Sequence, residues 1–190
     1  MARESTLSET LPRELAEARF SRLYHEHGRE ITGYALRRVA SPEDAADVVA
    51  ETFLVAWRRL DDVPAGVEAR LWLYGTARRI LANQRRGESR RTRLGERLRE
   101  ALRQEPTIYS TPHRADVLRA LSGLSDGDRE LLLLVGWEEL TPTQAARVLE
   151  ISPLAARSRL HRARRRLRAL LASEQAGDPE SNESEVEEAR

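Results

Sequence analysis

The sequence predicts an all-α protein with two small helical domains joined by a flexible linker. Glycine and proline are scarce, with 10 and 8 among 190 residues, and this scarcity favours helices over turn-rich sheets. Apolar residues recur at steps of three and four, which is the period of an amphipathic helix. A polar stretch that contains Pro106 and Pro112 separates two regions of this kind. Such a stretch is typical of an interdomain linker.

These patterns also predict the boundaries of the two domains. We expect the first domain over residues 13–88, the linker over 89–113 and the second domain over 114–172. Residues 1–12 and 173–190 have the polar composition of disordered segments, and the second of these segments is acidic.

The charge of the chain is unevenly distributed. Residues 174–190 contain seven acids and one arginine, a net charge of −6, so the remainder carries +7 of the total of +1. All 32 basic side chains are arginine, and a guanidinium group binds phosphate with two parallel hydrogen bonds. A basic body of this kind indicates a polyanionic partner. Because the acidic tail follows the basic C-terminal helix directly, we hypothesise that it shields this helix in the free protein. A solubilising end without this role is the alternative.

Several kinds of chemistry are excluded by composition. The chain has no cysteine, which excludes disulfides, thiol catalysis and cysteine–zinc sites. Two of the four histidines, His25 and His27, are close in sequence, but a step of two places them on different faces of a helix. We therefore expect no catalytic residue, metal or cofactor. No apolar run approaches the ~20 residues that span a bilayer, and no signal peptide is evident, so a cytoplasmic protein without membrane insertion is expected.

Three helices are expected in the first domain. Ser41, Pro42 and Asp44 mark the start of the second, because serine caps a helix, proline suits its first turn and an acid follows at the capping-box position. A break at residues 61–66 precedes a third helix of about residues 68–86, which Gly87 is expected to end. The expected apolar face comprises Phe20, Leu23, Tyr24, Ile31, Tyr34, Ala35 and Val39 in the first helix, and Ala45, Val49, Thr52, Phe53, Ala56 and Leu60 in the second.

The second domain is expected to end in a helix-turn-helix. Ser125 caps one helix, and Thr141, with Gln144 at the capping-box position, starts a short helix of about eight residues. Ser152 starts the last helix after a turn of three or four residues. This arrangement places its second helix in the major groove of DNA. A helical hairpin without a DNA-binding role remains the alternative.

Residues 157–168, RSRLHRARRRLR, are densely basic, with seven arginines in twelve residues. Leu160, Ala163, Leu167 and Leu171 form one apolar stripe along this helix, so the arginines occupy its other faces. An exposed basic helix suits nucleic acid. A solvated basic face at the end of a bundle is the alternative.

Two segments of the chain resemble one protein family. DAADVVAETFLVAWRRL, together with the later LWLYGTARRILANQRR, resembles region two of bacterial sigma factors of the extracytoplasmic-function (ECF) group in the sigma-70 family. LSGLSDGDRELLLLVGWEELTPTQAARVLEISPLAARSRLHRARRRLRALL resembles region four of the same group. The resemblance covers residues 14–88 and 114–172 and extends to the order of the segments and the short linker.

This resemblance implies a transcription initiation factor rather than an enzyme. Such a protein binds the clamp helices and the flap of core RNA polymerase, recognises a two-part promoter, helps to open the duplex and is usually controlled by an anti-sigma factor. A helix-turn-helix regulator that acts on duplex DNA without being a polymerase subunit is the alternative.

The helix at residues 44–60 resembles the one that binds core polymerase. An acidic stripe on it suits a basic coiled coil and would speed assembly by electrostatic steering. The alternative for Asp47 and Glu51 is that they are solvated helix acids, and the alternative for the aromatic residues is a core role. The candidates are Asp44, Asp47, Glu51, Thr52, Phe53, Trp57 and Arg58.

The third helix and the loop before it resemble the part that melts and recognises the minus-ten element. Opened bases must be held by pockets or aromatic surfaces, and phosphates must be neutralised by arginines. The loop at residues 61–69 is expected to form such a pocket, and burial of Trp72 between helices is the alternative. The candidates are Asp61, Asp62, Trp72, Tyr74, Arg78, Arg79, Asn83, Arg85 and Arg86.

The arginine helix resembles the reader of the minus-thirty-five element. An arginine on guanine contributes ~1–3 kcal/mol of discrimination, whereas an arginine on phosphate positions the protein without specifying sequence. The chain departs from the family at Leu154-Ala155-Ala156, where a Gly-Thr-Val-like run is common, and at Glu150, where a turn glycine is common. The candidates are Arg157, Ser158, Arg159, His161, Arg162 and Arg165.

Overall fold

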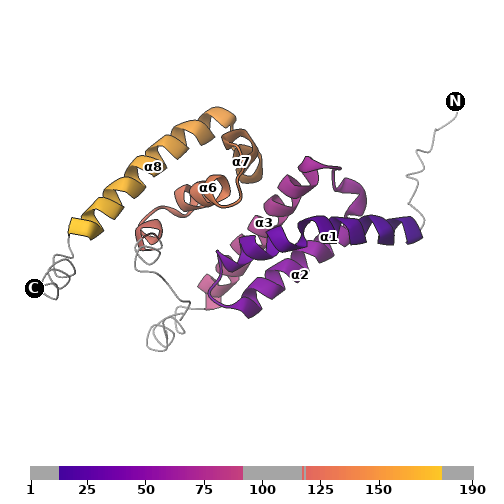
Figure 1. Cartoon of the computed structure of the whole chain (residues 1–190). Coiled ribbons are helices and arrows are strands. Elements are labelled where there is room, and N and C mark those ends of the chain that lie inside the picture. Colours follow the sequence, from indigo (N-terminus) through magenta and orange to yellow (C-terminus); the bar gives the residue numbers. More distant parts are fainter. Residues whose placement is uncertain (1–12, 92–116, 118, 177–190) are drawn as a thin grey trace, which may run out of the picture. The chain divides into compact units, whose positions relative to one another are not determined.

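The chain divides into two compact units, Met1–Glu100 and Ala101–Arg190. The computed structural model describes residues 13–91, 117 and 119–176 (Figure 1). Within these residues the regular structure is helical and no strand is present, so the predicted all-α fold with two helical domains is confirmed. The predicted N-terminal segment, most of the predicted linker and the tail beyond Ala176 lie outside the described residues.

The N-terminal unit is a bundle of three helices (Figure 1). It comprises α1 (Arg13–Leu36), α2 (Pro42–Arg58), the short 3-10 helix η1 (Leu60–Asp62) and α3 (Val67–Arg91). Each of the three α-helices contacts the other two. Tyr34 of α1 and Tyr74 of α3 are almost fully buried between them, with ring centroids 5.1 Å apart. Burial of such large side chains is the main stabilising contribution in a small bundle.

The start of α2 follows the predicted chemistry. Ser41 Oγ accepts a hydrogen bond from the backbone N–H of Asp44 at 3.1 Å, and proline occupies the first turn. The buried face of this helix differs from the prediction at one position, because Val48 is fully buried and Val49 only half-buried. Since α2 packs against both α1 and α3, its buried face is wider than a single stripe.

Two helices run past their predicted ends. Gly87 does not end α3, which continues to Arg91. A glycine inside a helix costs about 1 kcal/mol relative to alanine, but a glycine that ends a helix usually does so by adopting the left-handed conformation. Gly66, in the turn before α3, does adopt that conformation, with φ of 62°. Helix α8 continues to Ala176, four residues beyond the predicted end of the second domain.

The C-terminal unit is built around one long helix. It comprises α6 (Asp126–Gly136), α7 (Pro142–Leu149) and α8 (Pro153–Ala176), and residues 119–122 are also helical. Helix α8 contacts both α6 and α7 (Figure 1). Its buried residues Leu160 and Ala163 belong to the predicted apolar stripe. Farther along, Leu167 and Leu170 pack against a cluster of Leu121, Leu124 and Leu133.

The predicted helix-turn-helix is present as α7, a three-residue turn and α8. Thr141 Oγ1 accepts from the backbone N–H of Gln144 at 3.2 Å, and Gln144 Oε1 accepts from the backbone N–H of Thr141 at 2.9 Å. This reciprocal capping box starts α7. Glu150 ends α7 in the left-handed conformation, with φ of 58°. Ser152 Oγ then accepts from the backbone N–H of Ala155 at 3.1 Å and starts α8.

Candidate nucleic-acid and partner interfaces

The outward face of α2 is charged around one exposed leucine. The predicted residues Asp44, Asp47, Glu51 and Arg58 are all exposed. Leu54 lies three residues after Glu51 and is 46% exposed, so it shares their face of the helix. An apolar centre with a charged rim is typical of a protein–protein interface. Leu54 was not a predicted candidate, although its helical spacing from Glu51 is a signal that could have found it.

Two predicted polymerase-binding residues of α2 face inward. Thr52 is fully buried, and its Oγ1 donates a hydrogen bond to the Val48 carbonyl at 2.7 Å. Phe53 is 4% exposed. These side chains hold α2 against the bundle and offer no surface to a partner, because the core surrounds them.

Trp57 belongs to both the core and the surface. Its ring meets Phe20 edge-on, with centroids 5.2 Å apart, and it remains 39% exposed. Phe20 also meets Phe53 at 6.2 Å, and Phe53 meets Tyr24 at 4.8 Å. A row of four rings therefore follows the seam between α1 and α2. The end members, Tyr24 and Trp57, reach the surface.

Four of the predicted minus-ten residues share the outward face of α3. Trp72, Arg79, Asn83 and Arg86 follow one another at steps of seven, four and three, which keeps them on one side of a helix. Trp72 is half-buried and the other three are exposed, so the ring of Trp72 is partly available for stacking. Asn83 Oδ1 also accepts a hydrogen bond from Arg86.

The other predicted residues of α3 lie elsewhere. Tyr74 is 1% exposed and packs on Tyr34, so it supports the bundle and offers no surface for a base. Arg78 is half-buried on the flank. Arg85 Nη2 donates to the carbonyl of Arg38 at 3.4 Å.

The segment between α2 and α3 is anchored to the bundle. Asp61 and Asp62 are exposed, and Asp62 pairs with Arg59 at 2.9 Å. The side chain of Val63 is buried, and its carbonyl accepts a hydrogen bond from Arg19 Nη2 of α1 at 2.6 Å. The predicted loop is shorter than expected, because residues 60–62 form η1 and α3 begins at Val67.

Five of the six predicted minus-thirty-five residues are exposed on α8, namely Arg157, Ser158, His161, Arg162 and Arg165. The sixth, Arg159, is turned toward α6, and its Nε donates to Asp128 Oδ1 at 2.6 Å. Burial raises the pKa of Asp128, but hydrogen bonds from Arg159 and Ser125 and the charges of Arg159 and Arg162 outweigh it, so the net pKa is lowered. Arg159 therefore joins α8 to α6.

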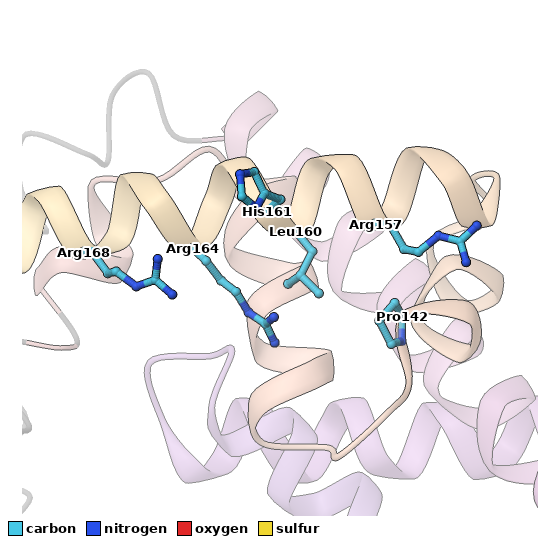
Figure 2. A pocket seen from close by; sticks show the side chains of 6 residues that line it. All are labelled: Pro142, Arg157, Leu160, His161, Arg164 and Arg168. Carbon is cyan, nitrogen blue, oxygen red and sulfur yellow. The ribbon is translucent and has the colours of Figure 1, made fainter.

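A basic hollow runs along the flank of α8 next to the start of α7. Its volume is about 340 Å³, and Figure 2 shows Arg157, Arg164 and Arg168 extending from α8 on the side where Pro142 lies. Leu160 and His161 complete the lining. Arg164 and Arg168 were not predicted, although they follow Arg157 at steps of seven and four. The hollow is lined by three guanidinium groups spaced along α8, and such a series suits successive phosphates of a nucleic-acid backbone.

No group of three or more histidine, aspartate or glutamate side chains in 13–91 and 117–176 is arranged to hold a metal ion. In the same part of the chain, no helix has both the length and the apolar character needed to cross a membrane.

The fold and these faces define a class of protein, a two-domain helical DNA-binding protein with a helix-turn-helix in its C-terminal unit. The family model of Sigma-70 region 2 matches residues 23–91, and that of Sigma-70, region 4 matches residues 114–167. ECF RNA polymerase sigma factor SigL of Mycobacterium tuberculosis is 32% identical over 161 residues, which are 82% of this chain and 91% of SigL. RNA polymerase sigma factor NccH of Alcaligenes xylosoxydans xylosoxydans is 29% identical over 184 residues, 90% of this chain and 98% of NccH.

Two solved structures of sigma factors resemble the structure of this chain. CnrH, solved in complex with the cytosolic domain of CnrY, has a TM-score of 0.60 and 28% identity over 85% of this chain and 97% of CnrH. Sigma factor RpoE of Bartonella quintana, solved with the anti-sigma factor NepR, shares the fold with a TM-score of 0.62 and 24% identity, covering 80% of this chain and 96% of RpoE. The chain belongs to the ECF RNA polymerase sigma factors.

Proposed function

We propose that the chain binds core RNA polymerase and directs it to two-part promoters, and that it performs no chemistry of its own. The observation that carries this proposal is the pair of separate helical units, in the order of region 2 and region 4, each with an exposed face suited to nucleic acid. An initiation factor needs both faces, because it must recognise an intact duplex and hold an opened strand.

The exposed face of α3 suits an opened strand, and the exposed face of α8 suits an intact duplex. On α3, the half-buried ring of Trp72 shares its outward face with Arg79 and Asn83, which lie about two and three turns farther along the helix. This face suits stacking of an unpaired base at one end and neutralisation of the strand's backbone farther along. On α8, exposed arginines surround Ser158 and His161, which suits base edges and phosphates of a duplex major groove. We assign the minus-ten strand to α3 and the minus-thirty-five duplex to α8.

The charged face of α2 is our candidate for docking on the polymerase clamp helices. Acidic side chains around exposed Leu54 give both electrostatic steering and an apolar centre. The relatives CnrH and RpoE were each solved with a bound regulator, CnrY or the anti-sigma factor NepR. We infer that an anti-sigma factor holds this chain inactive as well. We also infer that the chain acts in the cytoplasm, where the polymerase is.

In vitro transcription with purified core polymerase on fragmented genomic DNA of the host tests the proposal. We expect transcripts that start at a small set of sites only when the chain is present. A pull-down with core polymerase distinguishes an initiation factor from a helix-turn-helix regulator that acts on duplex DNA alone. Binding to duplex DNA without binding to polymerase would mean that the chain is a helix-turn-helix regulator and not an initiation factor.

A further inference from the structure

We propose that Leu154 recognises the methyl group of thymine in the upstream promoter element. This inference rests on the proposed seating of α8 in the major groove. Leu154 is 71% exposed, more than any other large hydrophobic side chain in the described part of the chain. A single exposed leucine is ordinary on a protein surface, so the exposure of Leu154 indicates a binding role only if its position on the helix supports one.

Leu154 lies at the end of α8 that enters the groove. Ser152 caps the helix and Pro153 is its first residue, so Leu154 belongs to the first turn. The N-terminal residues of the second helix of a helix-turn-helix are the ones that contact base edges. The exposure of Leu154 therefore occurs at the turn expected to lie closest to the bases.

The helical phase aligns Leu154 with the predicted DNA-binding residues. Ser158, His161 and Arg165 follow it at steps of four, three and four and are all exposed, so the four side chains share one outward face. The buried residues Ala156, Leu160 and Ala163 lie on the opposite side of the helix, against the rest of the unit. Leu154 therefore faces outward because of its register, and it contributes little to the core.

The chemistry of the major groove offers one partner for such a side chain. The base edges there are mainly hydrogen-bond donors and acceptors, and the C5-methyl group of thymine is the one apolar group that projects from them. A leucine side chain that covers a donor or acceptor displaces the water bound there and forms no hydrogen bond in its place. Contact with those edges is therefore unfavourable. When leucine contacts the thymine methyl group, apolar surface of both the side chain and the base is buried. Burial of one such carbon changes an equilibrium constant by about fourfold.

The experiment uses the complete chain assembled with core polymerase. Upstream elements are first selected from a randomised duplex pool with this holoenzyme. Each thymine of the selected element is then replaced by deoxyuridine, which removes only the methyl group, and binding is measured for the wild type and for Leu154→Ala. Arg165→Ala is the matched control, because it removes a polar side chain from the same face.

We expect one thymine position at which deoxyuridine weakens wild-type binding by about fourfold. Leu154→Ala should bind the thymine duplex about fourfold more weakly than the wild type and should show no further loss with deoxyuridine. Arg165→Ala should weaken binding to both duplexes and keep the methyl effect. A wild type that is indifferent to deoxyuridine everywhere, or a Leu154→Ala variant as sensitive as the wild type, would overturn the inference.

Two other outcomes separate this inference from the proposed function. If Leu154→Ala weakens binding to core polymerase and leaves the methyl effect intact, the leucine contacts the polymerase and the inference is wrong. If the wild-type holoenzyme selects no sequence from the pool at all, the proposed function falls together with the inference. If the holoenzyme selects a clear element but binds it equally well with deoxyuridine at every thymine position, the inference is wrong and the proposed function stands.

Discussion

Arg159 lies on the helix assigned to DNA, yet its guanidinium group pairs with Asp128 of α6 at 2.6 Å. The pair fits because Gly127 has no side chain, and a Cβ there would collide with the guanidinium of Arg159. Ser125 caps the same turn of α6 by accepting from the backbone N–H of Asp128 at 3.3 Å. Asp128 and Arg159 thus set the position of α8 relative to α6, and through it the direction of the exposed arginines.

Replacing Asp128 by asparagine should destabilise the protein in a pH-dependent way. Both partners are partly exposed, so we expect a loss of about 1 kcal/mol in the free energy of unfolding at neutral pH. Because the folded-state pKa of Asp128 is lowered, its contribution is present above the ordinary aspartate pKa of about 3.9 and is lost as the pH falls through the lower folded value. Urea unfolding from pH 7 to pH 3 would measure this, and the difference between wild type and Asp128→Asn should shrink toward acid.

Asp126→Asn is the matched control for this prediction. Asp126 is in the same first turn, but its side chain is 79% exposed and lies 3.5 Å from Arg129. Both substitutions remove one negative charge near the start of α6 and therefore change the helix-dipole interaction alike. A loss as large for Asp126→Asn as for Asp128→Asn would show that the dipole, and not the contact with Arg159, accounts for the effect.

Gly75 lies within α3 between Trp72 and Arg79, and a Cβ at this position meets no atom within 4 Å. Alanine is favoured over glycine in a helix interior, so Gly75→Ala should raise the free energy of unfolding by about 0.5–1 kcal/mol. The added methyl group would stand on the face assigned to the opened strand. We therefore expect the more stable variant to bind a single-stranded minus-ten oligonucleotide more weakly as holoenzyme, in a fluorescence titration.

Ala82→Gly provides the comparison, because it makes the opposite exchange farther along α3. It should lower the free energy of unfolding by a similar amount without adding bulk. If strand binding followed helix stability, Ala82→Gly would bind more weakly and Gly75→Ala more tightly. Unchanged strand binding by Gly75→Ala would mean that the backbone at residue 75 does not approach the strand closely.

The charged face of α2 leads to a prediction about polymerase binding. Leu54→Ala should weaken binding of the chain to core polymerase by about tenfold, because a central apolar side chain of an interface contributes more than 1 kcal/mol. The free energy of unfolding should change little, since Leu54 is 46% exposed. Leu36 at the end of α1 is 49% exposed, so Leu36→Ala removes an equally exposed leucine outside the proposed face. An equal loss for both variants in an anisotropy titration would contradict the assignment.

The helix starts could be predicted from the sequence because capping involves residues only three positions apart. Ser41, Ser125, Thr141 and Ser152 all accept the expected backbone hydrogen bonds. Helix ends were harder to predict. Gly87 permits an end without requiring one, so α3 continues to Arg91. The two-unit helical fold and the helix-turn-helix follow from these starts and from the apolar spacing.

The faces of the candidate sites could be predicted only in part. Helical spacing places Asp47 and Glu51 on the same side, and both are exposed. Spacing also places Thr52 on the apolar face of α2, and this residue is buried as expected. Spacing does not show which neighbouring helix covers a given residue of α3, and this is why the burial of Tyr74 was not predicted. Arg159 differs for another reason, since its partner Asp128 is 31 residues earlier in the chain. A contact of that range requires the fold and cannot be inferred from spacing.

Charge is distributed along the chain so that the most basic helix is followed directly by an acidic segment. Residues 177–190 carry six acids and one arginine, a net charge of −5. Fully extended, these 14 residues span up to about 50 Å, whereas α8 rises only about 28 Å between Arg157 and Ala176. The segment is therefore long enough to reach the whole basic hollow on α8. A tethered segment of this length acts at an effective concentration on the order of millimolar.

Removing residues 177–190 should raise the affinity of the free chain for duplex DNA several-fold at low salt. The acidic side chains compete with phosphates for the arginines of α8, and this competition weakens as the Debye length falls to about 8 Å at physiological ionic strength. Anisotropy titrations of a promoter duplex at 20 and 150 mM salt, for the intact and truncated chains, measure the effect. A chain of full length with the six acids replaced by their amides should behave like the truncated one, because charge and not bulk is the cause. Equal affinities of all three chains at low salt would show that the acidic segment leaves α8 open.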